Sequence, residues 1–310
     1  MRWPWRKNKQ GKRLSLTHLW GETDADATVL LIRVEGPILT SKASGIAGIA
    51  GRTCDGFEIE NHLRLAAHDE RIDAVVVQFA TPGGTVPGAQ AIGDGILHVR
   101  VRGKPVVAHI DGLSASGGVY AMVAADQIMA SVGSIIGSIG VTLGTHHVYT
   151  DVTAIRHGFG AGIEAKSPIS TRSYTAGMGK DILSPWREPS PAEEASIRAL
   201  LDDSYDLFVR RVAKFRHIPP EKIRDELGAL IFSESEAKRL NLIDSIGNRH
   251  HAVMTAIDLL GRPAQSKVRV VTPKQQRAGL LELLLGSRAE QFVQPAQMWG
   301  VRALWGHYGF

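Results

Sequence analysis

Two short apolar runs, each followed by a pair of adjacent glycines, constrain the fold of this chain more than any other feature. The runs are IDAVVVQFA (72–80) and KPVVAHID (104–111). Continuous, β-branched runs of this length are typical of parallel strands that are buried on both faces. TPGG (81–84) follows the first run, and SASGG (114–118) follows the second. We therefore expect two parallel strands whose carboxyl ends lead into glycine-rich turns, where α/β folds place their sites.

The segments around these runs alternate between strand and helix patterns. A strand is expected over 27–38, a helix over 58–70, and a further helix from about residue 90 to Val101. Two apolar stretches, 125–131 and 133–143, have the pattern of short strands with glycine bends. Strands that alternate with helices predict an α/β core with parallel strand pairing.

Beyond residue 190 the pattern becomes helical. Ser190 stands as N-cap, Pro191 at the first helical position and Glu193 at the third, which is a capping box. Shorter helices are expected within 233–244 and 248–260. One apolar stripe follows the long helix and is formed by Ile197, Leu200, Leu201, Tyr205, Phe208, Val209 and Val212.

The positive charge of the chain is concentrated at its N-terminus. Residues 1–13 carry six of the 36 Lys and Arg residues and no acid, which leaves 30 basic against 31 acidic residues elsewhere. A solvated tail is the simplest interpretation. The alternative is peripheral contact with anionic lipid, with Trp3 and Trp5 at the headgroup level. Nucleic-acid binding is not expected, because no basic face recurs in the rest of the chain.

These patterns divide the chain into three parts. We expect a basic, disordered arm over 1–26, an α/β domain over 27–260, and a linker with an amphipathic segment over 261–310. Trp299 and Trp305 in the last part favour an oligomer contact or packing element over a membrane anchor. No stretch reaches the roughly 18 apolar residues of a membrane span, and no apolar region follows the arm as in a signal peptide. The sequence thus predicts a cytoplasmic protein, with peripheral membrane association as an option.

The single cysteine limits the chemistry that the chain can perform. One thiol, Cys54, excludes an internal disulfide framework and a cysteine-based metal cluster. Its setting between glycines is typical of an incidental cysteine rather than a reactive one. We expect no metal and no cofactor.

The stretch DGLSASGGVYAM (111–122) holds two candidate nucleophiles, Ser114 and Ser116. A serine at the start of a helix most often caps it. The unpaired N–H groups there also favour negative charge, which suits a nucleophile. Two adjacent glycines in TPGG, Gly83 and Gly84, can form an anion-binding nest, and with the Gly117 N–H they can form an oxyanion hole. Each motif alone indicates no more than a turn or a cap.

A serine nucleophile needs a base that takes its proton. His109, His146 and His147 are the nearby histidines, and none stands with an acid in a recognisable triad signature. Histidine is the usual base, and lysine is the other option where burial leaves it neutral. Lys180, in the glycine-flanked turn GMGKD, is the preferred candidate, and Lys166 is its competitor.

Taken together, these motifs resemble the signal peptide peptidase A (protease IV) family of serine–lysine proteases. SASGGVYAMVAADQIMASVGSIIGSIGV (114–141) is similar to the serine signature of that family. TPGG resembles its Ser-Pro-Gly-Gly turn, and GKDILSPWREPSP resembles its lysine motif, so that the ordered match covers about residues 28–285. Thr81, Val119 and Asn241 depart from the family pattern of serine, an aromatic residue and glycine at these positions.

The resemblance implies a fold, an activity and a set of site residues. The fold is a Clp protease/crotonase-like spiral of ββα units with a helical C-terminal extension. The activity is endopeptidase cleavage of peptides, membrane-derived or signal peptides among them, or of partner proteins. Subunits form rings or domes, in which the serine and lysine of one site can come from neighbouring chains. The implied roles are nucleophile for Ser116, general base for Lys180, oxyanion region for Gly83, Gly84 and Gly117, and site lining for Ser138.

Two rival functions fit the same fold. One is a catalytically idle assembly protein that keeps the spiral as a scaffold. The other is a crotonase-like acyl-CoA enzyme with the same oxyanion geometry. Neither needs a serine, a lysine and a Pro-Gly-Gly turn together, so their joint presence favours the peptidase.

Overall fold

The structure is a computed structural model in two compact units. One unit comprises Met1–Gly140 and Tyr205–Arg277, and the other comprises Val141–Ser204 and Ala278–Phe310. The predictions for Lys166 and for the tryptophans of the N-terminal arm and the C-terminal segment lie outside the described residues. Those described are 13–41, 53–150, 154–157, 161–164, 168–169, 172, 174–263 and 265–274.

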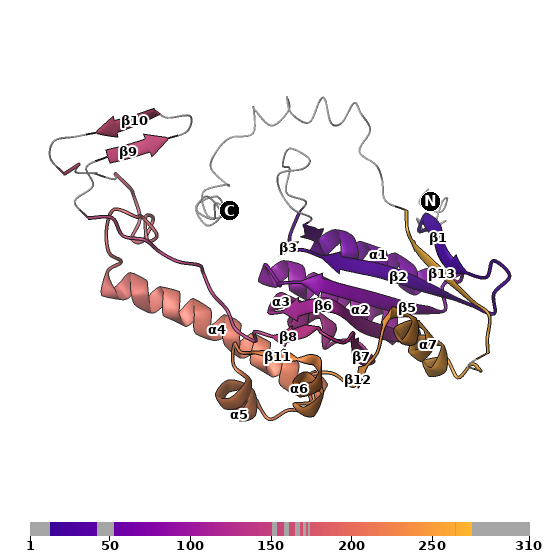
Figure 1. Cartoon of the computed structure of the whole chain (residues 1–310). Helices are drawn as coiled ribbons and strands as arrows, with labels where there is room; N and C mark the ends of the chain where they lie inside the picture. The colour runs from indigo at the N-terminus through magenta and orange to yellow at the C-terminus, as the bar shows by residue number, and fades with distance from the viewer. Residues whose placement is uncertain are drawn as a thin grey trace, which may run out of the picture. The chain divides into compact units, whose positions relative to one another are not determined.

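The first unit is built around a nine-stranded sheet (Figure 1). Its strands are β1 (Leu16–Gly21), β2 (Ala27–Glu35), β5 (Ala74–Thr81), β6 (Val106–Ala115), β7 (Gln127–Ala130), β8 (Ile135–Gly137), β11 (Ile231–Ser233), β12 (Ser245–Ile246) and β13 (Val268–Pro273). They follow the order β1-β13-β2-β5-β6-β7-β12, with β8 paired to β6 and β11 paired to β8. The neighbours from β13 to β12 are parallel, whereas β1 and β11 pair antiparallel. The predicted α/β core with parallel pairing is confirmed.

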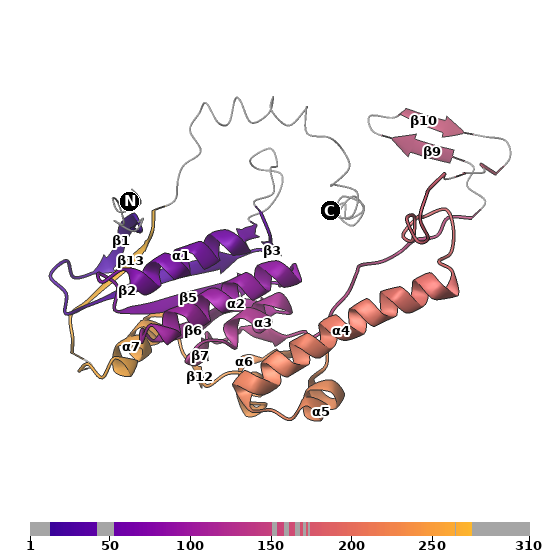
Figure 2. The same cartoon turned by 180° about the vertical axis from the view of Figure 1, so that it is seen from behind.

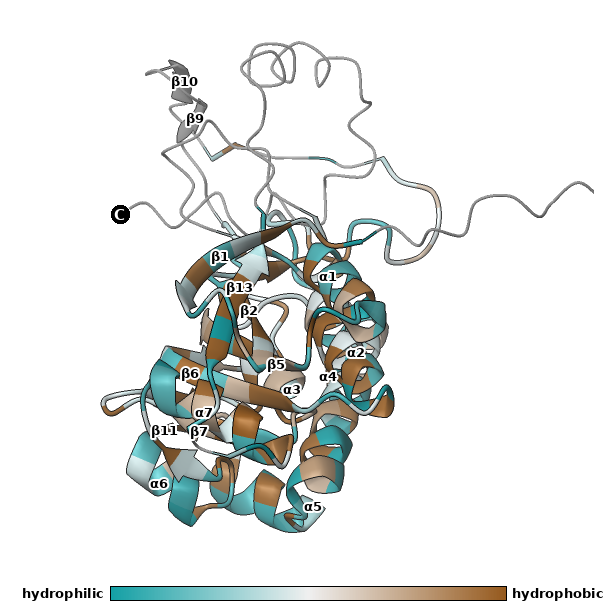
Figure 3. Cartoon of the chain, turned by 90° about the vertical axis from the view of Figure 1, so that its right-hand side faces the viewer, coloured by the Kyte–Doolittle hydropathy of each residue, from teal (hydrophilic) through white to brown (hydrophobic). Residues whose placement is uncertain are grey.

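Helices cover both faces of this sheet. Side chains of α1 (Gly56–His68), α2 (Val86–Val101) and α3 (Gly117–Met122) pack on one face, together with part of α4 (Pro191–Arg216). α7 (Arg249–Leu259) packs on the opposite face (Figures 1 and 2). Crossover helices between parallel strands are the architecture that the family resemblance implies. Smaller elements are β3 (Ile38–Leu39), β4 (Cys54–Asp55), α5 (Pro220–Lys222), the π-helical turn η1 (Ile223–Leu227) and α6 (Glu234–Arg239), which is mostly hydrophilic in Figure 3.

The central strands explain why apolar runs predicted the core so well. In β5, Val75, Val77 and Phe79 face the α1–α2 side, and Ala74 and Val76 face α7. All five side chains are fully buried. Because each buried valine or phenylalanine contributes about 1.5–3 kcal/mol, a strand that is buried on both faces must be apolar throughout.

Two segments expected outside the folded domain belong to the sheet. β1 lies within the predicted arm 1–26, and β13 lies within the C-terminal part predicted over 261–310. β13 pairs in parallel with β2, and β1 pairs antiparallel with β13. Short strands of mixed polarity have no strong sequence signal, because their stability comes from partners that are more than 200 residues away in the chain.

The start of one helix differs from the prediction, and the start of another agrees with it. α2 begins at Val86 instead of about residue 90, because the Thr85 side chain caps it by accepting from the Gly88 N–H. The capping box of α4 is confirmed: Glu193 Oε2 accepts from the Ser190 N–H at 2.8 Å, and Ser190 Oγ accepts from the Glu193 N–H at 3.4 Å. Only the C-terminal part of its apolar stripe is buried, since Leu200 is 55% exposed.

The second unit carries a two-stranded antiparallel sheet, β9 (Ala154–His157) with β10 (Ala161–Glu164), and the turn that leads into α4. Within the described residues of the chain, no helix combines the length and hydropathy of a membrane span.

Candidate active site

Ser116 sits at the sharp turn between β6 and α3. Its backbone has φ 49° and ψ −118°, a conformation that a residue with a Cβ rarely adopts. The turn is fixed from both sides, because the Ser116 N–H donates to Gly137 O at 2.9 Å and its carbonyl accepts from the Tyr120 N–H at 3.0 Å. Strain of this kind costs about 1–3 kcal/mol and persists only where the surroundings enforce it. The Ser116 side chain makes no capping bond and is partly exposed, so the helix-cap interpretation does not describe it.

Ser114, the other candidate nucleophile, is part of the packed core. It is fully buried, and its hydroxyl donates to the sulfur of Met122 at 3.3 Å. A substrate cannot reach this hydroxyl without opening the core, which leaves Ser116 as the accessible serine.

The Gly83–Gly84 turn lies directly against Ser116. A Cβ placed on Gly83 would be 2.7 Å from the Gly117 nitrogen and 2.8 Å from the Ser116 Cβ. A Cβ on Gly84 would be 2.0 Å from Ile38 O. Both residues have positive φ, at 100° and 151°. The close approach and the backbone conformation therefore both require glycine.

Three backbone N–H groups, those of Gly83, Gly84 and Gly117, belong to the turns beside Ser116. The Gly83 N–H is used, because it donates to Thr81 Oγ1 at 3.0 Å. Gly84 joins a parallel bridge with Ile38, but the N–H groups in that bridge belong to Ile38 and Thr85. Gly117 is the first residue of α3, where an N–H has no partner within the helix. A Cβ on Gly117 would be 3.3 Å from the Gly84 nitrogen, so the backbone of the glycine turn and the first residue of α3 lie close together beside Ser116.

Thr81 shows why a hydroxyl precedes Pro-Gly-Gly. Its Oγ1 donates to Gly36 O at 2.7 Å while it accepts from the Gly83 N–H. A serine hydroxyl offers the same two bonds, so the departure from the family pattern at Thr81 leaves this anchor intact.

Ser138 lies beside Ser116 across two strands. β8 pairs in parallel with β6 so that Gly137 is opposite Ala115, which places the next residue of each strand side by side. Ser138 also has positive φ, 54°, and its N–H donates to Leu230 O at 2.6 Å. Two partly exposed serines in strained backbone thus stand together at the carboxyl edge of the sheet.

Sequence reasoning missed two residues that hold the segment before Ser116. The pairing of β5 with β6 passes from Phe79–Ile110 to Thr81–Ser114, so β6 accommodates two extra residues. Gln78 Nε2 donates to Asp111 Oδ2 at 2.5 Å, and Ser134 Oγ accepts from the Gly112 N–H at 3.2 Å. The sequence signal was Gln78, a polar residue inside the apolar run AVVVQFAT. Its role becomes visible only when the pairing of β5 with β6 is known.

Of the three nearby histidines, only His109 lies in the same unit as Ser116, and it bonds elsewhere. His109 is buried, with its Nε2 3.1 Å from Ser131 Oγ and 3.3 Å from Gly247 O, and burial lowers its pKa. His146 and His147 belong to the second unit. There, Nε2 of His146 lies 2.9 Å from Ser184 O.

Lys180 belongs to the second unit, in the turn before α4. Its backbone N–H donates to Gly177 O at 3.3 Å, and its side chain is exposed in the single chain. Ser116 and Lys180 therefore lie in different units, and their pairing stays a prediction.

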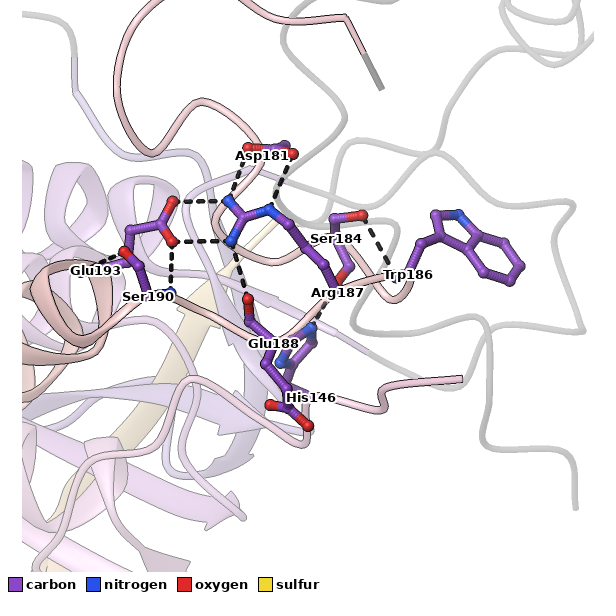
Figure 4. Close-up of polar contacts among 8 residues, drawn as sticks. All are labelled: His146, Asp181, Ser184, Trp186, Arg187, Glu188, Ser190 and Glu193. Atoms are coloured by element: carbon purple, nitrogen blue, oxygen red, sulfur yellow. Dashed lines mark hydrogen bonds and ion pairs between the residues drawn. The ribbon is translucent and has the colours of Figure 1, made fainter. Parts of the chain in front are cut away.

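Arg187 joins Asp181, the residue after Lys180, to Glu193 in the first turn of α4 (Figure 4). The Arg187 guanidinium donates to both carboxylate oxygens of Asp181, from Nε to Oδ2 at 3.1 Å and from Nη2 to Oδ1 at 2.7 Å. It also donates to both carboxylate oxygens of Glu193, from Nη1 to Oε2 at 2.8 Å and from Nη2 to Oε1 at 2.7 Å. These bonds lower the pKa of Glu193 to about 2, lower the pKa of Asp181, and raise that of Arg187. The residue that follows Lys180 is thereby tied to the first turn of α4.

The fold and the site together define the class of protein. It is an α/β protein that presents a strained, accessible serine at a strand-to-helix turn, in contact with a Pro-Gly-Gly turn. The chain belongs to peptidase family S49, whose family model matches residues 98–261. That range contains Ser116, Ser138 and Lys180, and the resemblance found in the sequence is confirmed.

Individual relatives cover different parts of the chain. The protein slr0021 of Synechocystis sp. is 35% identical over 193 residues, which is 62% of this chain and 65% of that protein. Protease 4 of Salmonella typhi is 27% identical over 237 residues, which is 76% of this chain and 35% of that enzyme. The chain thus spans less than two thirds of either relative. A solved structure of a mutant 1510-N membrane-bound stomatin-specific protease aligns with a TM-score of 0.49 at 14% identity, covering 81% of this chain and 100% of that one.

Proposed function

We propose that this chain is a serine endopeptidase with a Ser116–Lys180 dyad. Ser116 Oγ attacks the peptide carbonyl carbon while neutral Lys180 takes its proton. The Gly84 and Gly117 N–H groups hold the oxyanion, with Gly83 shaping the turn and Ser138 lining the site. Lys180 then gives the proton to the leaving amine, and water releases the acyl group from Ser116. The enforced strain at Ser116 is the observation that carries this proposal, because a structural serine has no need of it.

The exposure of Lys180 bears on how the site is completed. A lysine acts as a base only in its neutral form, which burial favours. Because Lys180 is exposed in the single chain, we propose that a second subunit, the substrate or both cover it. This supports a homo-oligomer with shared sites, in which the lysine of one chain serves the serine of its neighbour. We propose peptides or proteins as substrates, with contact to a membrane surface through residues 1–13.

Covalent labelling tests the dyad. The purified full chain is treated with a serine-directed fluorophosphonate, and the adduct is located by peptide mass spectrometry. We expect the adduct on Ser116, and we expect Ser116→Ala and Lys180→Ala each to remove at least nine tenths of the labelling. Ser235→Ala and Lys238→Ala, which change exposed side chains of α6, are the matched controls and should label normally.

The outcomes separate the rival functions. Full labelling of Lys180→Ala would rule out the lysine as base. A folded, assembled protein that never labels would favour the scaffold. Cleavage of an acyl-CoA thioester without any adduct would favour the crotonase-like enzyme.

A further inference from the structure

Two histidines on neighbouring helices face each other away from the serine site. His68 is the last residue of α1, and His98 lies near the end of α2; the two helices run side by side (Figure 2). The Nε2 atoms are 3.3 Å apart. The ring centroids are 5.4 Å apart and the ring planes are tilted by 44°, so the rings meet through their nitrogens and are not stacked.

The separation of these nitrogens matches a coordination geometry. Zn²⁺ binds imidazole nitrogen at about 2.0–2.1 Å with tetrahedral angles, which places two ligating nitrogens roughly 3.3–3.4 Å apart. A square-planar metal at the same bond length would bring them to about 2.9 Å. The 3.3 Å between the two Nε2 atoms matches a tetrahedral edge, and in the absence of a metal one ring donates a hydrogen bond to the other across this distance.

Nearby charges affect how tightly a cation can bind between the two rings. A metal ligand must be the neutral imidazole. Arg64 and Arg102 place positive charge near His98, and Glu60 places negative charge there. Arg64 Nη2 lies 2.7 Å from Glu60 Oε1, and this carboxylate offsets part of the repulsion between Arg64 and a bound cation. Arg102 still weakens binding, so the site suits a metal that exchanges with solution.

We propose that His68 and His98 form a two-histidine site for a divalent transition metal, with Zn²⁺ as its preferred ion and water in the open positions. Bound metal would join the end of α1 to α2 and stabilise their packing. The site is independent of the proposed peptidase chemistry. His98 is twelve residues after Val86, where α2 begins beside the glycine turn, a distance of about 18 Å along the helix. Among the described residues there is no cluster of three or more His, Cys, Asp or Glu that could hold a metal.

Thermal unfolding of the untagged, chelator-treated full chain tests this site. We expect the Tm to rise by several degrees with micromolar ZnCl₂ and to be unchanged by MgCl₂, because Mg²⁺ prefers oxygen ligands. His68→Asn and His98→Asn should each abolish the zinc-dependent rise. His217→Asn, which removes an exposed histidine with positive φ that asparagine tolerates, should retain it.

A spectroscopic titration guards against variants that are themselves less stable. Co²⁺ in a tetrahedral nitrogen site absorbs visible light more strongly than octahedral Co²⁺, and it is titrated into each folded variant at 25 °C. The proposal predicts a saturable band at one Co²⁺ per chain in the wild type and His217→Asn, which is lost in both site variants and displaced by Zn²⁺. No zinc-dependent rise in the wild type, or a rise that survives in both site variants, would overturn it.

Discussion

The arrangement around Ser116 depends on individual glycines whose roles differ. Gly84 combines a φ of 151° with a position where a Cβ would meet Ile38 O at 2.0 Å. Gly103 also has a positive φ, 78°, but a Cβ there would meet nothing within 4 Å. The two positions therefore separate the cost of backbone conformation from the cost of a steric clash.

Gly84→Ala is expected to destabilise the protein more than Gly103→Ala and to inactivate it. Gly103→Ala should cost about 1–2 kcal/mol, the usual penalty of the left-handed region. Gly84→Ala should cost more and should move its N–H away from Ser116, so fluorophosphonate labelling falls at least tenfold. Urea unfolding and labelling rates measure both effects. Equal losses of stability and unchanged labelling would contradict this role of Gly84.

Arg187 is expected to position Lys180 through the guanidinium fork. Arg187→Lys keeps the charge but cannot bind Asp181 and Glu193 in two bidentate pairs. We expect labelling of Ser116 to fall roughly tenfold, with the dependence of labelling rate on pH displaced. Arg198→Lys is the matched control, because Arg198 pairs with Glu194 on the same helix and makes no bond to the Lys180 turn. Equal effects of the two substitutions on labelling would show that Arg187 does not position Lys180.

At the scale of elements, the start of α4 is predicted to depend on pH. The pKa of Glu193 is lowered to about 2, first by Arg187 and then by the bond from the Ser190 N–H. A carboxyl with a lowered folded pKa stabilises the fold above its ordinary pKa of about 4.5, and this contribution is lost as pH falls from about 4.5 toward 2. Glu193→Gln should therefore be less stable than the wild type at pH 6, and the difference should shrink toward pH 3. Urea unfolding at both pH values measures it, and a constant difference would speak against the linkage.

Elements were predictable from sequence where burial on both faces dictated them. β5 and β6 are apolar because helices cover both sides of the central sheet, and Ser190 with Glu193 signalled the start of α4 locally. β1 and β13 were not predictable, because each depends on a partner at the other end of the chain. The two extra residues in β6 were hidden for the same reason, since a register exists only between paired strands.

At the scale of the whole molecule, the assembly proposed for the site has a direct test. Ser116→Ala and Lys180→Ala chains, each inactive alone, are mixed under conditions that exchange subunits. If each site combines the serine of one chain with the lysine of its neighbour, random mixing should restore roughly a quarter of the wild-type activity. Peptide cleavage before and after exchange measures the recovery. Exchange without recovery would place both residues of a site in one chain.

The sequence by itself determined the α/β core, the candidate residues and the family. Short apolar runs report burial, and Gly-Gly, Ser and Lys motifs report turns and chemistry, because both depend on residues near one another in the chain. The tertiary structure decided that Ser116 is accessible while Ser114 is buried, and that the Gly83 N–H is bound to Thr81. These outcomes depend on contacts between distant strands, which no local pattern encodes.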